Sequence, residues 1–242
     1  MPSNNEATLG FEDFKQEVLS DYKLACISRE ASLLGRKEVL TGKAKFGIFG
    51  DGKELAQLAL AKNFKPGDFR SGYYRDQTWM MAIGALSVQA YFSGLYAHTD
   101  VAVEPQSAGR QMGGHFATRN LDEHGQWKNL TQQKNSSADI SPTAGQMPRL
   151  LGLALASKVY RNNPALHTEE FQQFSIQGNE VAFGSIGDAS TSEGPFWETL
   201  NAAGVLQVPM VMSVWDDGYG ISVPRELQTT KNSISEALAG FQ

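Results

Sequence analysis

The sequence predicts an α/β fold in which a parallel sheet is flanked by helices. Two short apolar runs rich in β-branched residues, at 181–186 and 208–214, have the composition of buried strands. A helix-like segment at 196–206 separates them, and the order strand, helix, strand is typical of a parallel sheet. At 242 residues and 41% hydrophobic content, the chain is long enough to bury a core around such a sheet.

Helical periodicity accounts for much of the remaining chain. Apolar residues at helical spacing predict helices over 11–40, 53–62, 78–96 and 147–159, and Gly42 ends the first of them. The polar, glycine-rich stretch 107–142 follows neither a helical nor a strand period and is predicted to be mostly loop. A loop of this length inside a domain is usually functional. We expect residues 1–45 to form an N-terminal helical arm ahead of the sheet-containing domain at 46–242.

The balance of charges argues against several classes of protein. The formal net charge is -5, acids and bases are interspersed, and no polybasic arm is present, so nucleic acid is not an expected partner. The first residues lack the basic start and apolar core of a signal peptide, and no apolar run reaches membrane-spanning length. Cys26 is the single cysteine, which excludes an internal disulfide and fits a reducing compartment. We expect a cytoplasmic protein that does not bind membranes.

Acidic residues follow both predicted strands at the point where each strand ends. Asp188 comes after the run 181–186, and Asp216 and Asp217 come after the run 208–214. Ligands of open parallel sheets bind beyond the carboxyl ends of the strands, and two carboxylates in one crevice favour a cation between them. The pattern indicates a magnesium or calcium site that binds a phosphate ligand. The alternative is that Asp188 caps the next helix and that the Asp216-Asp217 pair only forms a turn.

Several motifs occur in an order that resembles one enzyme family. The segment that begins with GDA (187–189) and ends with DGY (217–219) resembles the thiamin diphosphate motif, which begins Gly-Asp-Gly and ends in paired asparagines. The segments GRQMGGHF (109–116), SPTAGQMP (141–148) and DDGYGIS (216–222) are similar to the alpha-type half of 2-oxo acid dehydrogenases, of the branched-chain or pyruvate type. The similarity runs from about residue 52 to residue 223 and implies a thiamin diphosphate-binding fold for the domain at 46–242.

The resemblance assigns a metal and diphosphate site to the two strand ends. Asp188, the side chain of Asp217 and the backbone carbonyl of Tyr219 would bind Mg²⁺, with Ca²⁺ or Mn²⁺ as alternatives. The backbone of Gly187, Asp188 and Ala189 would lie against the diphosphate of the cofactor.

The resemblance also assigns roles to residues outside these strand ends. Tyr74 and Arg75 match a tyrosine-arginine pair in which the arginine contacts phosphate oxygens. Ser141 and Thr143 fall in the loop that contacts the aminopyrimidine of the cofactor. His115 matches a histidine near the reacting carbon that exchanges protons with substrate intermediates, and is the expected catalytic residue.

Several positions depart from the family pattern. Asp217 replaces the usual asparagine and adds negative charge to the metal site, and Ala189 replaces a glycine. Thr143 stands where branched-chain relatives have a large aliphatic residue, and Trp215 stands where they often have a phosphate-binding arginine. Family members continue through further strands after the position of Gln242, so we expect a C-terminally truncated fold, either a fragment or the N-terminal part of a longer enzyme.

The reaction that the resemblance implies is oxidative decarboxylation of a 2-oxo acid, with acyl transfer to lipoamide of the next enzyme in a complex. The glutamate that activates the aminopyrimidine belongs to a beta-type half in this family. A beta-type partner, separate or fused as a C-terminal region, a lipoyl-bearing acyltransferase and a hetero- or homo-oligomer are therefore implied, with no activity for this chain alone. The alternatives are an acetoin dehydrogenase, a transketolase-like thiamin enzyme, and a noncatalytic metal-phosphate binding or assembly module.

Overall fold

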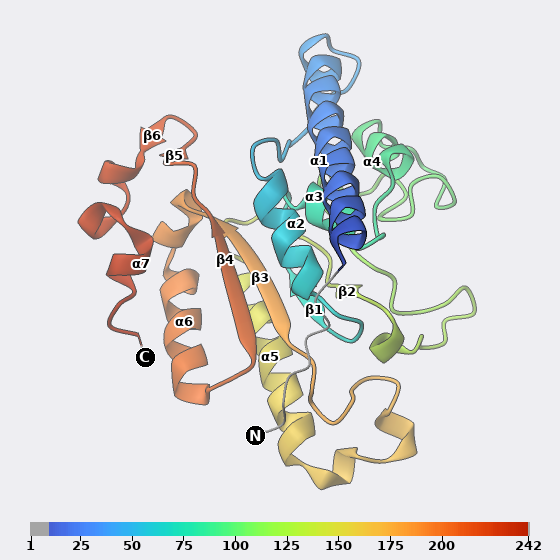
Figure 1. Cartoon of the computed structure of the whole chain (residues 1–242), viewed down its shortest axis with the longest axis vertical. Helices are drawn as coiled ribbons and strands as arrows, with labels where there is room; N and C mark the ends of the chain where they lie inside the picture. The colour runs from blue at the N-terminus through green and yellow to red at the C-terminus, as the bar shows by residue number, and fades with distance from the viewer. Residues whose placement is uncertain (1–9, 242) are drawn as a thin grey trace.

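Four parallel strands form the central sheet, in the order β2-β1-β3-β4. The computed structural model describes residues 10–241, so residues 1–9 of the expected arm and Gln242 of the expected domain lie outside the described residues. The predicted α/β class, with a parallel sheet flanked by helices, is confirmed (Figure 1). The helices are α1 Phe11–Leu40, α2 Glu54–Asn63, α3 Gln77–Ala82, α4 Val88–Leu95, α5 Met147–Asn162, α6 Gly194–Leu206 and α7 Ile234–Ala237. The strands are β1 Phe69–Ser71, β2 Asn135–Ser136, β3 Ala182–Gly187, β4 Met210–Trp215, and β5 Tyr219–Gly220 paired with β6 Val223–Pro224.

The two predicted strands are confirmed as neighbours in the sheet. β3 and β4 pair in parallel along their whole length, from Ala182 opposite Met210 to Gly187 opposite Trp215. The strands β1 and β2 were not predicted, because segments of three and two residues are too short to show a strand period. Since all four strands run in the same direction, their carboxyl ends meet at one edge of the sheet.

Helices cover both faces of β3. Phe183 points to the face of α2 and α3, where it packs with Phe64 and Trp79. Ile186, three residues on, points to the opposite face and packs with Met147 of α5 and Phe196 of α6. Because side chains on both faces of β3 are covered by helices, neither face needs polar residues. This explains why the sequence of β3 is a continuous apolar run.

The predicted helix over 78–96 is two helices, which corrects that expectation. Gly84 lies between α3 and α4 with a φ of +77°, a conformation that ends a helix and that glycine adopts without strain. Ser87 then starts α4, because its side-chain oxygen accepts a hydrogen bond of 3.0 Å from the backbone N–H of Ala90. The predicted helices over 11–40, 53–62, 147–159 and 196–206 are confirmed within a few residues.

The long helix α1 lies against α2, α3 and α4 at one side of the molecule (Figure 1). Across residues 10–241, no helix is both long and apolar enough to span a membrane. The stretch 107–142 is mostly loop as predicted, apart from strand β2, a short 3₁₀ turn at Leu130–Gln132 and one isolated bridge between Leu121 and Trp127.

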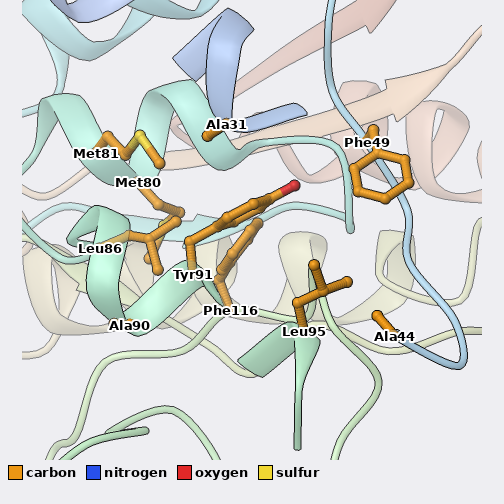
Figure 2. Close-up of a cluster of buried hydrophobic side chains, with 10 residues drawn as sticks. All are labelled: Ala31, Ala44, Phe49, Met80, Met81, Leu86, Ala90, Tyr91, Leu95 and Phe116. Carbon is orange, nitrogen blue, oxygen red and sulfur yellow. The ribbon is translucent and has the colours of Figure 1, made fainter. Parts of the chain in front are cut away.

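Aromatic side chains join α4 to the loop that precedes β2. Figure 2 shows Phe116 from this loop beside Tyr91 of α4, with Phe49 at the other end of the same cluster. Phe116 is 3% exposed, so the loop is fixed to the core at this residue although it carries little secondary structure. The residue directly before it, His115, is held in place by this anchor.

A fully buried arginine links β1 to its neighbours. Arg70 of β1 donates hydrogen bonds to Asp76 (2.7 and 3.0 Å), to Asp139 (3.0 Å) and to Ser136 of β2 (2.8 Å). The side chains of Arg70, Asp76 and Asp139 have no exposed surface. Burial opposes the charge of the guanidinium, but the carboxylates of Asp139 and Asp76 more than offset this effect and raise the pKa of Arg70. The arginine is therefore charged and paired with two acids.

Asp76 extends this network to the other two strands. Its carboxylate accepts hydrogen bonds from Ser185 of β3 and, at 2.9 Å, from the indole N–H of Trp215, the last residue of β4. Gly72 passes directly over the ion pair, and a Cβ atom there would lie 2.1 Å from Oδ2 of Asp76. One buried network of charges and hydrogen bonds thus reaches all four strands.

We predict that Arg70→Met lowers the free energy of unfolding by about 3–5 kcal/mol, because it leaves two buried carboxylates without their counter-ion. Denaturant unfolding followed by circular dichroism measures this change. The control is Lys15→Met, which removes a cation from an ion pair with Glu12 whose side chains are 52% and 72% exposed. It should cost less than about 1 kcal/mol. Equal effects of the two substitutions would contradict the prediction.

Candidate functional site

A pocket of about 970 Å³ opens at the carboxyl edge of the sheet. Ligands of parallel sheets bind at this edge, where loops and helix ends meet. Of the residues predicted for the site, those that line the pocket are Tyr74, Arg75, Thr143, Gly187, Asp188, Ala189, Asp217 and Tyr219. The structure therefore brings together residues that are far apart in the sequence.

Asp188 lies directly after β3 and is 5% exposed. Its side chain makes no capping bond to the following 3₁₀ turn; its Oδ2 instead accepts a hydrogen bond of 3.1 Å from the backbone N–H of Gly218, beyond the end of β4. Burial raises the pKa of Asp188, and the negative charges of Asp217 and Asp216 raise it further. Asp188 thus has a direct link to the neighbouring strand end and lies among like charges that a cation would neutralise.

The turn after β4 presents two carboxylates with different partners. Asp216 pairs with Arg225 at 2.9 Å. Asp217 pairs with the ammonium of Lys53 at 3.1 Å, and its Oδ1 accepts a hydrogen bond of 3.2 Å from the backbone N–H of Tyr219. Gly218 has a φ of +81°, and its backbone N–H donates hydrogen bonds to Asp216 (3.0 Å) and to Asp188 (3.1 Å). This turn fixes the predicted ligand Asp217 beside Asp188 at the pocket wall.

The donor set fits a divalent cation bound by oxygen atoms. Asp188, Asp217 and Tyr219 all line the pocket and carry carboxylate and backbone carbonyl oxygens, the ligands that magnesium and calcium prefer. Among residues 10–241, no group of three histidine, cysteine, aspartate or glutamate side chains is placed to hold a metal ion. A cation here would need oxygens from a bound phosphate ligand or water to complete its shell, which is usual for magnesium.

Arg75 is held at the pocket by backbone contacts. Its guanidinium donates a hydrogen bond of 2.7 Å to the carbonyl of Phe49 and lies 5.8 Å from the ring centre of Tyr74. Its own carbonyl accepts a hydrogen bond of 2.9 Å from Gln57 of α2. Arg75 directly precedes Asp76, so the buried network positions it at this edge.

His115 and Ser141 meet each other next to the pocket and are not among the residues that line it. Nε2 of His115 lies 2.9 Å from Oγ of Ser141, and Nδ1 lies 3.2 Å from the carbonyl of Met112. A carbonyl only accepts, so in the neutral imidazole Nδ1 carries the proton and Nε2 accepts from the serine hydroxyl. The ring of His115 lies 5.8 Å from the ring of Tyr74, which does line the pocket. His115 and Ser141 are thus beside the pocket, with the ring of Tyr74 between His115 and the cavity.

The buried network around Arg70 positions two groups of candidate site residues. Oδ2 of Asp139 accepts a hydrogen bond of 3.0 Å from the N–H of Phe116, and the N–H of Asp139 donates 2.9 Å to the carbonyl of Phe116. Phe116 follows His115, and Asp139 precedes Ser141 by two positions. Arg70 therefore positions His115 and Ser141 through Asp139, and Tyr74 and Arg75 through Asp76.

Sequence reasoning missed two features of the pocket. Lys53 pairs with Asp217 across 164 sequence positions, and no local motif marks such a pair. Trp215 was noted only as a replacement for an arginine, whereas its indole N–H is engaged by Asp76. The remaining histidines, His98, His124 and His167, do not line the pocket.

Comparison with known proteins places the chain in a family. The family model described as "Dehydrogenase E1 component" matches residues 22–242. The chain belongs to this family. The resemblance drawn from the sequence motifs, to the alpha-type half of 2-oxo acid dehydrogenases, is thereby confirmed.

Relatives of this E1-family chain are alpha subunits. It is 30% identical to the 2-oxoisovalerate dehydrogenase subunit alpha of Bacillus subtilis (strain 168), over 100% of this chain and 63% of the relative. It is 25% identical to the pyruvate dehydrogenase E1 component subunit alpha of Acholeplasma laidlawii, over 93% of this chain and 52% of the relative. It is 25% identical to the mitochondrial 2-oxoisovalerate dehydrogenase subunit alpha of Caenorhabditis elegans, over 77% of this chain and 36% of the relative. The E1-family chain thus spans less than two thirds of the length of these relatives.

The loop that leads to His115 is organised by one buried carboxylate. Glu104 is 1% exposed and accepts hydrogen bonds from the N–H groups of Gln106 (2.9 Å), Ser107 (2.8 Å) and Gly109 (3.0 Å). Burial alone would raise the pKa of Glu104, but the N–H groups of Gly109 and Ser107 stabilise the carboxylate and lower the pKa below its ordinary value of 4.5. The charged form of Glu104 thus stabilises the folded loop.

We predict that Glu104→Gln lowers the free energy of unfolding at pH 7 by about 1 kcal/mol or more, since hydrogen bonds to a charged acceptor are stronger than those to an amide. Because the pKa of Glu104 is lower in the folded chain than in the unfolded one, its contribution is present above pH 4.5 and is lost as the pH falls through the folded-state pKa. Unfolding measured between neutral and acidic pH should show the difference between the two proteins shrinking on acidification. A difference that is constant with pH would contradict this role.

Proposed function

We propose that this chain is the alpha-type half of a thiamin diphosphate-dependent enzyme that decarboxylates a 2-oxo acid oxidatively and passes the acyl group to lipoamide. The observation that carries the proposal is the pocket at the carboxyl edge, where Asp188 and Asp217 from neighbouring strand ends line the same cavity as Arg75. Membership of the E1 family supports the cofactor. Bound thiamin diphosphate supplies an electron sink for the carbanion left by carbon dioxide.

The residues of the pocket have separate tasks in this proposal. Asp188, Asp217 and the carbonyl of Tyr219 would hold magnesium beside the diphosphate, with calcium or manganese as alternatives. Gly187 and Ala189 leave room for a ligand to approach the backbone beyond β3, and Arg75 adds a planar cationic donor for phosphate oxygens. Thr143 lines the same pocket and is proposed to contact the aminopyrimidine.

His115 is the proposed proton-transfer residue. In its neutral tautomer Nε2 accepts from the Ser141 hydroxyl at 2.9 Å, so a proton would reach Nε2 through that hydroxyl, which passes its own proton to the ring and takes up the incoming one. The buried side chain of Phe116 anchors the backbone next to His115, and Asp139, two residues before Ser141, hydrogen-bonds to that backbone. This arrangement gives a histidine that is oriented by contacts on both ring nitrogens.

The proposal includes partners and a substrate class. The relatives' names point to a branched-chain 2-oxo acid or pyruvate as substrate. A beta-type half, separate or fused, would supply the glutamate that activates the cofactor, and a lipoyl-bearing acyltransferase would accept the acyl group in an oligomeric complex. We propose a cytoplasmic location, supported by the single cysteine of the sequence.

We predict that Asp188→Ala abolishes magnesium-dependent binding of thiamin diphosphate, because a buried metal ligand is removed. Calorimetric titration of the enzyme assembled with its beta-type half measures this affinity with and without magnesium. Asp217→Asn should retain binding, since an amide oxygen can still coordinate the metal. Full affinity in Asp188→Ala would remove Asp188 from the site. Absence of binding by the unsubstituted enzyme would favour the noncatalytic alternative.

We predict that His115→Ala lowers turnover by about a hundredfold or more while leaving cofactor affinity nearly unchanged, as expected for a positioned acid-base group. Turnover is measured with the complete enzyme and lipoamide, and affinity by calorimetry. Ser141→Ala removes the hydroxyl that orients Nε2 and should have a smaller effect in the same direction. Normal turnover of His115→Ala would reject the catalytic assignment, and a joint loss of stability and affinity would indicate a structural role instead.

A further inference from the structure

Three cationic side chains line the pocket, and each already has a partner in the described part of the chain. Arg36 pairs with Asp51 at 2.6 Å, and Arg75 donates a hydrogen bond of 2.7 Å to the carbonyl of Phe49. Lys53 pairs with Asp217 at 3.1 Å. Of these, only Lys53 is paired with a residue expected to bind the metal.

Lys53 is also placed deeper than its partner. Its side chain is 14% exposed, whereas that of Asp217 is 57% exposed and that of Arg36 is 47% exposed. The ammonium has three N–H donors, and its hydrogen bond within residues 10–241 is the one to Asp217. A sheltered ammonium at a pocket wall, with donors to spare, is a strong candidate to bind an anion.

Trp215, the last residue of β4, offers a ligand no free side-chain donor. Trp215 has its indole N–H engaged by Asp76 at 2.9 Å, so it cannot offer that group to a ligand. Asp188, Asp216 and Asp217 lie together at this side of the pocket, and the only cations paired with them in the described chain are Lys53 and Arg225. An incoming phosphate would meet these carboxylates unless a cation moves between them.

We propose that Lys53 is a phosphate-binding residue of this pocket, held by Asp217 until a divalent cation takes over that carboxylate. The proposal rests on the proposed function and adds a residue to its diphosphate site. A divalent cation attracts the carboxylate more strongly than a monovalent ammonium does, so metal binding at Asp217 releases Lys53. The released ammonium then donates to phosphate oxygens beside the metal. Magnesium and diphosphate would therefore bind cooperatively.

Titration with inorganic diphosphate tests directly whether Lys53 binds phosphate, because this probe needs neither substrate nor turnover. The complete enzyme is titrated by calorimetry with and without magnesium, as the unsubstituted protein and as Lys53→Met. The matched control is Lys62→Met, which removes the same charge from the other end of α2, where Lys62 pairs with Asp21 at 2.8 Å outside the pocket. Lys53→Met should weaken magnesium-supported binding by about tenfold, and Lys62→Met should leave it unchanged.

The partner carboxylate gives a second test that does not depend on the first variant. Without magnesium, Asp217→Asn should raise the affinity for diphosphate by about tenfold, because Lys53 loses its counter-ion and becomes available. The double variant Lys53→Met/Asp217→Asn should lose this gain. A gain that persists in the double variant would overturn the proposal, because it would come from the lost charge of Asp217 alone.

The outcomes separate this proposal from the function on which it rests. Suppose that the unsubstituted enzyme binds diphosphate with magnesium and that Lys53→Met binds it equally well or better. Lys53 then only competes with the metal for Asp217, so the proposal for Lys53 fails while the proposed function stands. If the unsubstituted enzyme does not bind diphosphate even with magnesium, the proposed function itself fails.

Discussion

The buried ion pair between Arg70 and Asp76 is the interaction on which the rest of this structure depends. Arg70 lies on β1, reaches Ser136 on β2, and pairs with Asp76, which in turn binds Ser185 on β3 and Trp215 on β4. A charge without any exposed surface is costly unless it is paired and hydrogen-bonded, so these groups hold their geometry tightly. The short strands β1 and β2, of three and two residues, are therefore held to β3 and β4 by side-chain hydrogen bonds as well as by backbone hydrogen bonds.

The ion pair between Arg70 and Asp76 also positions residues of the candidate site. Asp76 follows Arg75 in the chain, and Asp139 binds the backbone of Phe116 beside His115. The Arg75 side of the pocket and the His115 side are therefore fixed to one buried guanidinium, although 66 sequence positions separate Arg70 from Ser136. Such a network suits a site that needs positioned groups on loops, because the loops themselves contribute few backbone bonds.

Electrostatic balance is the second constraint on the site. Asp188, Asp216 and Asp217 lie at the carboxyl edge of the sheet. Burial is the main cause of the raised pKa of Asp188, and the negative charges of Asp217 and Asp216 raise it further. Arg225 and Lys53 neutralise two of these acids within the protein. The replacement of the family's asparagine by Asp217 is thus accompanied by a local counter-ion. A site of this kind can exchange an internal cation for an external one without leaving a carboxylate unpaired.

The sequence by itself determined the parallel α/β fold, the two long strands and the acids at their ends, because apolar runs, helical spacing and strand-end residues are local patterns. The motif resemblance also predicted that Tyr74, Asp188 and Asp217 share a site, and they line one pocket, whereas Ser141 and His115, predicted for the same site, do not line it. Only the tertiary structure decided the strands β1 and β2, the split of 78–96 into two helices, and the placement of His115 behind the ring of Tyr74. Likewise, the pairing of Lys53 with Asp217 joins residues 164 positions apart, and such contacts follow from the packing of whole elements rather than from any local pattern.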